Sequence, residues 1–256
     1  MEIIMQLALL TALGVGGATV IGALLGFFFK NPSHKMNDII LAFAAGVMLA
    51  AAVIGLIMPS LEGTSKWNIL ITITGIFCGA VCLHLLDKLV PHLHHLAGVD
   101  TEGHSEKNAQ LNQVLLFVLA IALHNLPEGM AAGVGVGSGD HSAALTIAGG
   151  IALQNIPESM VMIAPMLAVG MSRRRAFVCA LATGLIEVAG TFIGYFAVYI
   201  SEAILPFLLA FAGGTMLYVI SDEMIPETHA HGAERAATYA LLIGFCVMLA
   251  TDFLLG

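Results

Sequence analysis

Apolar residues are arranged along this chain in eight long runs that short polar segments separate. The runs lie at residues 3–29, 39–58, 69–86, 114–136, 143–169, 177–200, 204–220 and 236–255. Each approaches or exceeds the ~20 residues that an α-helix needs to cross about 30 Å of hydrocarbon. The pattern predicts an all-α, polytopic membrane protein, in which residues 1–256 form a single bundle of eight transmembrane helices.

The composition supports a membrane protein over an unusually apolar soluble enzyme. Hydrophobic residues make up 59% of the chain and charged residues only 10%, whereas a soluble domain carries about 25% charged residues. The formal net charge of −8 is spread over the loops, which disfavours nucleic-acid binding. Glycines within the apolar runs predict close helix packing, at Gly14, Gly16 and Gly17 in the first run and at Gly190 and Gly194 in the sixth.

The basic residues predict how the chain is oriented. Lys66 alone lies on one face of the predicted bundle, and eight basic residues lie on the other: Lys30, Lys35, Lys88, Lys107, Arg173, Arg174, Arg175 and Arg235. Cytoplasmic loops carry an excess of Lys and Arg. We therefore expect the first, third, fifth and seventh loops to be cytoplasmic and both termini to lie outside the cell membrane.

Histidines gather in two of the predicted cytoplasmic loops. The third loop, at about residues 91–112, carries a histidine cluster, and the seventh carries two more histidines beside acidic residues. An ordinary polar linker and a weak metal-collecting segment are both open interpretations. In the seventh loop, acids and imidazoles together could receive a released ion. The residues concerned are His92, His94, His95 and His104, and then Asp222, Glu223, Glu227, His229 and His231.

A polar motif interrupts the fourth apolar run and recurs in the fifth. Residues 121–130 read IALHNLPEGM, and thirty positions later residues 151–160 read IALQNIPESM. Pro127 and Pro157 each remove a backbone N–H and free the carbonyl four residues earlier. Transporters often build a midplane site from paired, interrupted helices, so the fourth and fifth helices are predicted to form the functional site.

The motif spacing presents three ligand types together. His124 and Glu128 are four residues apart and share one helix face, with about 6 Å of rise between them. Asn125 is three residues from the same glutamate. The second motif repeats the pattern with Gln154, Asn155 and Glu158.

The carboxylates need a cation or a proton. Glu128, Glu158 and Glu187 lie within apolar runs, and each would cost about 2.5–3.5 kcal/mol at the bilayer centre. These runs contain no deeply placed Lys or Arg. Taken singly, such a glutamate could be a protonated packing or proton-relay residue, and such a histidine a structural one. The duplication favours a divalent metal, because imidazole, carboxylate and amide oxygen together suit Zn²⁺ and similar cations.

With these motifs the chain resembles the ZIP (Zrt/Irt-like) family of divalent-metal transporters along essentially its whole length. The segments QNIPES, AFAAGVMLAA and YVISDEMIPETHAHG are similar to those of the bacterial GufA-like branch. The resemblance implies a mid-membrane centre of two metals that Glu128 and Glu158 bridge. It also implies a homodimer, and metal as the substrate rather than a cofactor.

The resemblance further implies a ligand set for each metal. One metal would be held by His124, Glu128, Gln154 and Glu158, with Met48 nearby, and the other by Asn125, Glu128, Asn155, Glu158 and Glu187. Reasoning from the residues alone reaches the ligands of the fourth and fifth helices and makes Glu187 plausible. It does not single out Met48, one of 13 methionines.

The leading hypothesis is a secondary transporter that imports divalent cations into the cytoplasm, most often Zn²⁺ in the family, with Fe²⁺, Mn²⁺ or Cd²⁺ as other substrates. A P-loop sequence is missing, which leaves ATP-driven pumping unsupported. An intramembrane metal-dependent hydrolase or protease is an alternative, although the chain lacks H-E-x-x-H. A metal-gated channel is a third hypothesis. The rate of transport, rather than the sequence, would distinguish a channel from a carrier.

Overall fold

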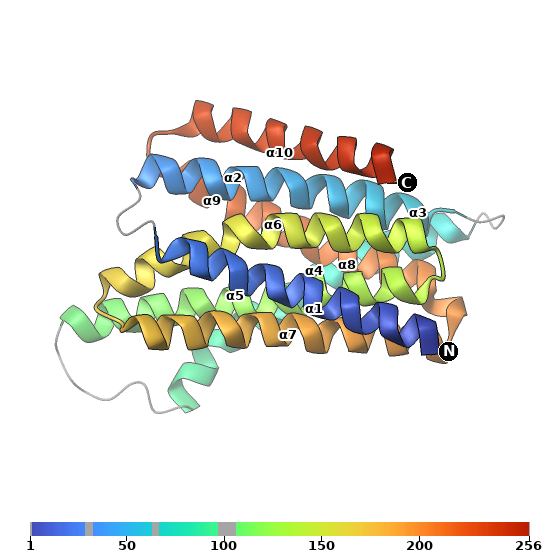
Figure 1. The fold of residues 1–256 in the computed structure, drawn as a ribbon, viewed down its shortest axis with the longest axis horizontal. Coiled ribbons are helices and arrows are strands. Elements are labelled where there is room, and N and C mark those ends of the chain that lie inside the picture. Colours follow the sequence, from blue (N-terminus) through green and yellow to red (C-terminus); the bar gives the residue numbers. More distant parts are fainter. Residues whose placement is uncertain (1, 29–32, 63–66, 97–105, 256) are drawn as a thin grey trace.

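The computed structural model describes residues 2–28, 33–62, 67–96 and 106–255, without the side chains at 2, 3, 87, 89–96, 106–117, 120, 202 and 255. In this part of the chain, long helices lie side by side in one bundle (Figure 1). The prediction of an all-α protein is confirmed. The long helices are α1 (Glu2–Gly26), α2 (His34–Ala50), α4 (Asn68–Leu96), α5 (Glu106–Gly137), α6 (His141–Ala168), α7 (Arg173–Ile200), α8 (Leu205–Val219) and α10 (Glu234–Leu255).

Two of these helices are extended by π-helical turns. Helix α2 continues through the π-helix η1 (Ala51–Ile57) into α3 (Met58–Ser60), and α8 continues through the π-helix η3 (Ile220–Met224) into α9 (Ile225–Thr228). A 3₁₀ turn, η2 (Glu202–Ile204), precedes α8. Isolated π-helical turns inside α-helices are frequent at functional sites.

Seven helical segments of the described chain are long and apolar enough to cross a membrane, which confirms a polytopic membrane protein. Helix α5, with the first polar motif, is not among the seven but packs between α7, α6 and α8. The count of eight crossings, with α5 as the eighth, therefore stays a prediction. Helix α1 begins and α10 ends at the same end of the bundle (Figure 1).

The predicted third loop is shorter than its sequence suggests. We expect it at about residues 91–112, but residues 91–96 continue α4 and residues 106–112 lie in α5. Polarity ends the apolar run at this point, but a change from apolar to polar residues does not by itself end a helix. Helix α4 therefore extends past the apolar run, through Pro91 to Leu96.

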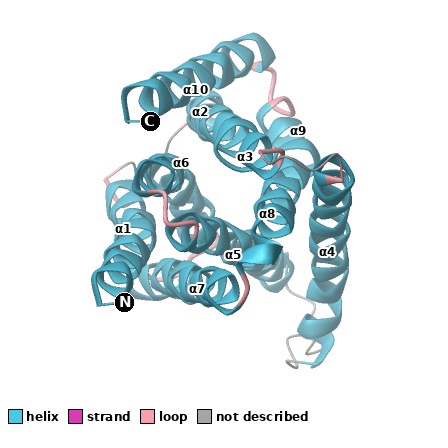
Figure 2. Ribbon diagram, turned by 90° about the vertical axis from the view of Figure 1, so that its right-hand side faces the viewer, coloured by secondary structure: helices cyan, strands magenta, loops and turns pink. Residues whose placement is uncertain are grey.

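The helices form two groups that pack against each other (Figure 2). In the first, which we call the motif bundle, α1 packs on α6 and α7, and α5 packs on α7. In the second, the flanking bundle, α2 packs on α10 and α4 on α8. The two groups meet where α2 lies against α6 and where α5 lies against α8.

Glycines bring α5 and α7 together within the motif bundle. A Cβ atom on Gly129 would collide with the carbonyl oxygen of Glu187, and one on Gly190 would collide with that of Leu126. Small residues at such spacing let membrane helices approach closely. Predictions of close packing are confirmed for Gly16, Gly190 and Gly194, but Gly14 and Gly17 would meet no atom within 4 Å.

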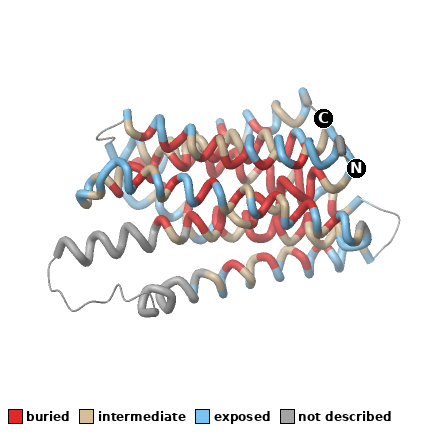
Figure 3. The backbone as a smooth tube through the Cα atoms, turned by 60° about the horizontal axis from the view of Figure 1, so that its bottom comes forward, coloured by how far each residue is buried: buried red, intermediate tan, exposed pale blue. Residues whose placement is uncertain are grey.

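Burial follows the expected pattern for a bundle in lipid. Buried residues line the inside of the helices and exposed ones the outside (Figure 3). Large apolar side chains such as Phe77, Leu185 and Phe253 are exposed on the outer surface. The buried polar side chains, by contrast, include all the predicted ligands of α5, α6 and α7, which are therefore inside the bundle.

Candidate metal centre

The residues that are predicted to hold the two metals are all buried. Met48, on α2, is also buried, within the main apolar core. None of these residues is more than 5% exposed: His124, Asn125 and Glu128 on α5, Gln154, Asn155 and Glu158 on α6, Glu187 on α7, and Met48.

The two motifs bond to each other crosswise. The Nε2 atom of His124 lies 2.5 Å from Oε1 of Glu158, and Nε2 of Gln154 donates to Oε1 of Glu128 at 2.8 Å. In each bond, the first polar residue of one motif reaches the glutamate of the other. The sequence repeat thus becomes a reciprocal pair of contacts between α5 and α6.

Helix α1 supports two of the three remaining polar side chains, Glu187 and Asn155. The Oγ1 atom of Thr19 lies 2.8 Å from both carboxylate oxygens of Glu187. The Nδ2 atom of Asn155 donates to the carbonyl oxygen of Val15 at 3.4 Å. Sequence reasoning did not predict these two contacts. A threonine within an apolar run, close to Gly16, was the available signal.

Several buried atoms of this centre have no hydrogen-bond partner among the described residues. Leaving such an atom unpaired costs about 1–3 kcal/mol, and more if it is charged. All have lone pairs that a cation could accept, apart from the tautomer dependence of the imidazole nitrogen. The atoms are His124 Nδ1, Glu128 Oε2, Gln154 Oε1, Asn155 Oδ1 and Glu158 Oε2.

The carboxylates are close enough to affect one another. Glu128 interacts electrostatically with Glu158, and Glu187 interacts with both. When it is protonated, His124 would offset part of this negative charge, because its ring nitrogens lie 2.5 Å from Glu158 and 3.7 Å from Glu223. Nitrogen, carboxylate and amide oxygen donors of this kind fit a borderline divalent cation.

The donors are not, however, prearranged around one point. Among the described residues, no group of three or more His, Cys, Asp or Glu side chains is placed to hold a metal ion. Instead, His124 and Glu128 form hydrogen bonds with Glu158 and Gln154 of the opposite motif. Coordination would require these bonds to exchange for bonds to the cation, with amide oxygens completing the set.

Glu223 lies closer to the centre than its place in the sequence suggests. It belongs to η3 in the flanking bundle, and its Oε2 atom is 3.7 Å from Nδ1 of His124. This distance is too long for a hydrogen bond but short enough for an ion pair if the histidine is protonated. The contact links the two bundles at the centre.

The histidines of the seventh loop have other partners. The Nδ1 atom of His231 lies 3.0 Å from Oδ1 of Asp38, and its ring stacks on His34 with centroids 4.9 Å apart. His229 contacts the carbonyl oxygen of Ile225 at 2.9 Å. Asp222 and Glu227 are exposed, so the structure does not gather the acids and histidines into one group. The side chains of His92, His94 and His95 lie outside the described residues.

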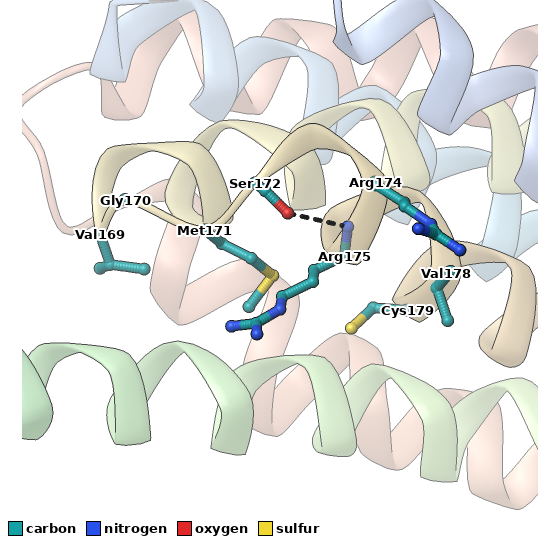
Figure 4. Close-up of a pocket in the computed structure, with 8 residues that line it drawn as sticks. All are labelled: Val169, Gly170, Met171, Ser172, Arg174, Arg175, Val178 and Cys179. Carbon is teal, nitrogen blue, oxygen red and sulfur yellow. Dashed lines mark hydrogen bonds between the residues drawn. The ribbon is translucent and has the colours of Figure 1, made fainter.

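A cavity of about 630 Å³ lies apart from the centre, at the turn between α6 and α7. Figure 4 shows Arg175, Met171 and Cys179 at this turn, where the hydroxyl of Ser172 accepts the backbone N–H of Arg175 at 3.4 Å. Its lining contains none of the predicted ligands. The buried motifs, rather than this cavity, are the candidate site.

Comparison with known proteins agrees with the motifs. The family model described as ZIP zinc transporter matches residues 90–252. The chain is 40% identical over 260 residues to the zinc transporter GufA of Myxococcus xanthus. This alignment covers 98% of this chain and all of that protein. The chain is 37% identical over 248 residues to the zinc transporter ZIPB of Bordetella bronchiseptica, covering 93% of this chain and 78% of that protein.

A further relative has similar coverage. The chain is 34% identical over 246 residues to the zinc transporter ZupT of Chlorobaculum parvum, with 91% of each chain covered. The matched family model spans both polar motifs and α7. This chain therefore belongs to the ZIP family, in its GufA-like branch, and is a multi-pass membrane transport protein rather than an enzyme.

Proposed function

We propose that this protein is a secondary transporter that brings divalent transition-metal cations, Zn²⁺ foremost, into the cytoplasm. The observation that carries the proposal is the crosswise pairing of two buried motifs in which five donor atoms have no hydrogen-bond partner among the described residues. The relatives named above are zinc transporters, which supports Zn²⁺ among the divalent cations that such donors bind.

In this proposal two cations bind side by side and share the glutamates. The first takes the imidazole of His124 and the amide oxygen of Gln154, with the Met48 thioether near. The second takes the amide oxygens of Asn125 and Asn155 and the carboxylate of Glu187. Glu128 and Glu158 bridge the two positions, which their mutual electrostatic interaction supports.

Binding proceeds by exchange of partners. The cation loses water as it enters, and the bond between His124 and Glu158 gives way to bonds from each of these groups to the metal. Gln154 keeps its Nε2 on Glu128 and offers Oε1, which is unpaired in the described structure. The ligands must be deprotonated to coordinate, so binding releases protons.

Transport then requires the cation to reach the cytoplasmic face. The bridging glutamates and Glu187 all belong to the motif bundle, whereas Glu223 belongs to the flanking bundle and lies 3.7 Å from His124. We propose that movement of the motif bundle against the flanking bundle passes the cation from His124 to Glu223. The excess of basic residues at one face supports termini that lie outside the cell.

The test is metal uptake into proteoliposomes that contain a trapped zinc-sensitive dye. Saturable uptake by the wild-type protein and its loss in Glu128→Ala are expected, while Glu234→Ala, which alters an exposed acid in the first turn of α10, should transport normally. Uptake that survives Glu128→Ala would place the site elsewhere. Uptake that does not saturate with metal concentration would favour a channel.

A homodimer is part of the proposal and rests on the family resemblance. The mass of the protein in detergent, measured by light scattering with the detergent contribution subtracted, tests it. A monomeric mass in protein that still transports would overturn this part alone.

A further inference from the structure

Helix α1 contributes no predicted ligand, yet it contacts two ligands of the proposed second metal position. Thr19 bonds to both carboxylate oxygens of Glu187, each at 2.8 Å, and the carbonyl of Val15 accepts a bond from Asn155 at 3.4 Å. The ligands of the first position bond instead to the opposite motif. The two metal positions therefore differ in what supports them.

The approach of α1 to α7 explains why a short side chain reaches Glu187. A Cβ atom on Gly16 would lie 2.6 Å from the carbonyl oxygen of Gly184, so the two backbones are in direct contact there. Thr19 is three residues after Gly16, and Glu187 is three residues after Gly184. Because α1 and α7 run in opposite directions, Thr19 packs over Gly184, where a Cβ atom would lie 3.5 Å from Cβ of Thr19. From there its hydroxyl reaches the carboxylate of Glu187, about one turn away on α7.

The carboxylate of Glu187 is held differently from the carboxylates of the bridging residues Glu128 and Glu158. Thr19 and Glu187 are each only 1% exposed, so neither side chain is free to reorient into open space. Both oxygens of Glu187 lie within hydrogen-bond distance of the one Thr19 hydroxyl, whereas Glu128 and Glu158 each keep one oxygen unpaired among the described residues. A threonine hydroxyl has one proton, so it can hold one oxygen of Glu187 while the other binds a cation.

We propose that Thr19 is a positioning residue of the second metal position and acts by orienting the Glu187 carboxylate toward a divalent cation. The inference rests on the proposed function and adds the residue, on α1, that sets the affinity of one position without touching the metal. Partners of this kind typically change metal affinity by about 10–100-fold when they are removed.

The experiment is a Cd²⁺ titration of the purified full-length protein, followed by calorimetry, with uptake measured in parallel. Thr19→Val keeps the shape of the side chain and removes the hydroxyl, and Thr19→Ser keeps the hydroxyl. Thr183→Val is the matched control, because Thr183 is also 1% exposed but bonds to the carbonyl of Ala180 in its own helix.

In Thr19→Val we expect the weaker of two binding steps to lose about 10–100-fold in affinity, while the tighter step is unchanged. Thr19→Ser and Thr183→Val should bind as the wild type does. In a Glu187→Ala background, Thr19→Val should add no further loss, because the residue acts through that carboxylate. A merely structural role would instead give additive losses and affect both steps.

Unchanged or tighter binding in Thr19→Val would overturn the inference, as would a loss in Thr19→Ser of the same size. Additive losses in the Glu187→Ala background would overturn it too. Failure of the proposed function has a distinct result, since the wild-type protein would then show no saturable uptake in the parallel assay, whatever Thr19 does.

Discussion

The two motifs differ at their first polar residue, and this difference matters chemically. Both residues make the same kind of crosswise bond, His124 to Glu158 and Gln154 to Glu128. An imidazole nitrogen is a stronger ligand for Zn²⁺ than a neutral amide oxygen. The centre therefore combines one firm and one weak ligand at equivalent positions, which suits a site that must also release its cation.

Replacing the weak ligand should tighten binding and slow turnover. In Gln154→His we expect Zn²⁺ to bind about tenfold more tightly or better, because an imidazole replaces the amide, and the maximal uptake rate to fall. Titration with Zn²⁺ and initial uptake rates measure the two effects. Gln154→Asn, which keeps the amide, is the control, and a faster maximal rate in Gln154→His would contradict the argument.

Protons should compete with the cation. His124 and the glutamates bind metal only when deprotonated, so apparent affinity should be high at neutral pH and fall as the outside becomes acidic. Initial uptake rates against metal concentration, measured at a series of external pH values, check this. A KM that stays flat down to the range where carboxylates protonate would count against direct coordination by these groups.

At the scale of the helices, small residues decide how the ligands are placed. Helices α5 and α6 continue unbroken through Pro127 and Pro157, so each motif stays on one helix. Gly129, next to Glu128, lies against the backbone of Glu187 on α7. The third glutamate thus approaches the first because a glycine leaves room for it.

A methyl group at this contact should damage both packing and binding. Gly129→Ala would force α7 away from α5, with a stability loss of about 1–3 kcal/mol as for other overpacked sites, and weaker binding at the position of Glu187. Thermal unfolding in detergent and Cd²⁺ titration measure these effects. The matched control is Gly14→Ala, where a Cβ would meet no atom within 4 Å, and an equal loss in both variants would refute the packing argument.

At the scale of the whole molecule, the predicted ligands are divided unequally between two groups of helices. Of the residues predicted to hold the two metals, all but Met48 belong to the motif bundle, and Glu223 approaches them from the flanking bundle. Across the boundary, a Cβ atom on Gly150 of α6 would lie 3.4 Å from that of Ala51 in η1. If the bundles move against each other, a bond at this place should stop transport.

Two cysteines at the boundary test the movement. In a background lacking the four native cysteines, Gly150→Cys with Ala51→Cys has a Cβ separation close to that of natural disulfides. We expect oxidation to abolish uptake and reduction to restore it. Gly135→Cys with Ile147→Cys, whose Cβ atoms would lie 3.6 Å apart, joins α5 to α6 within the motif bundle and should transport in both states. Full uptake by the oxidised boundary pair would exclude the movement.

Much of this protein could be predicted from its sequence, because a bilayer imposes strong rules on what may cross it. Long apolar runs require helices, and buried carboxylates without basic partners require a proton or a cation. The duplicated pattern at His124 and Gln154 therefore predicts a metal centre between the fourth and fifth helices, and both residues are buried there. The predicted extent of the third loop, about residues 91–112, was wrong, because residues 91–96 are polar yet helical.

Only the tertiary structure decided which groups meet across helices. The crosswise bonds between the motifs, the approach of Glu223 to His124 and the contact of Thr19 with Glu187 join residues from 26 to 168 positions apart. Apolar periodicity tells which residues avoid water, but in lipid it does not select a partner helix, since the tails are as apolar as the side chains. Close backbone packing, set by glycines such as Gly16 and Gly129, makes that selection.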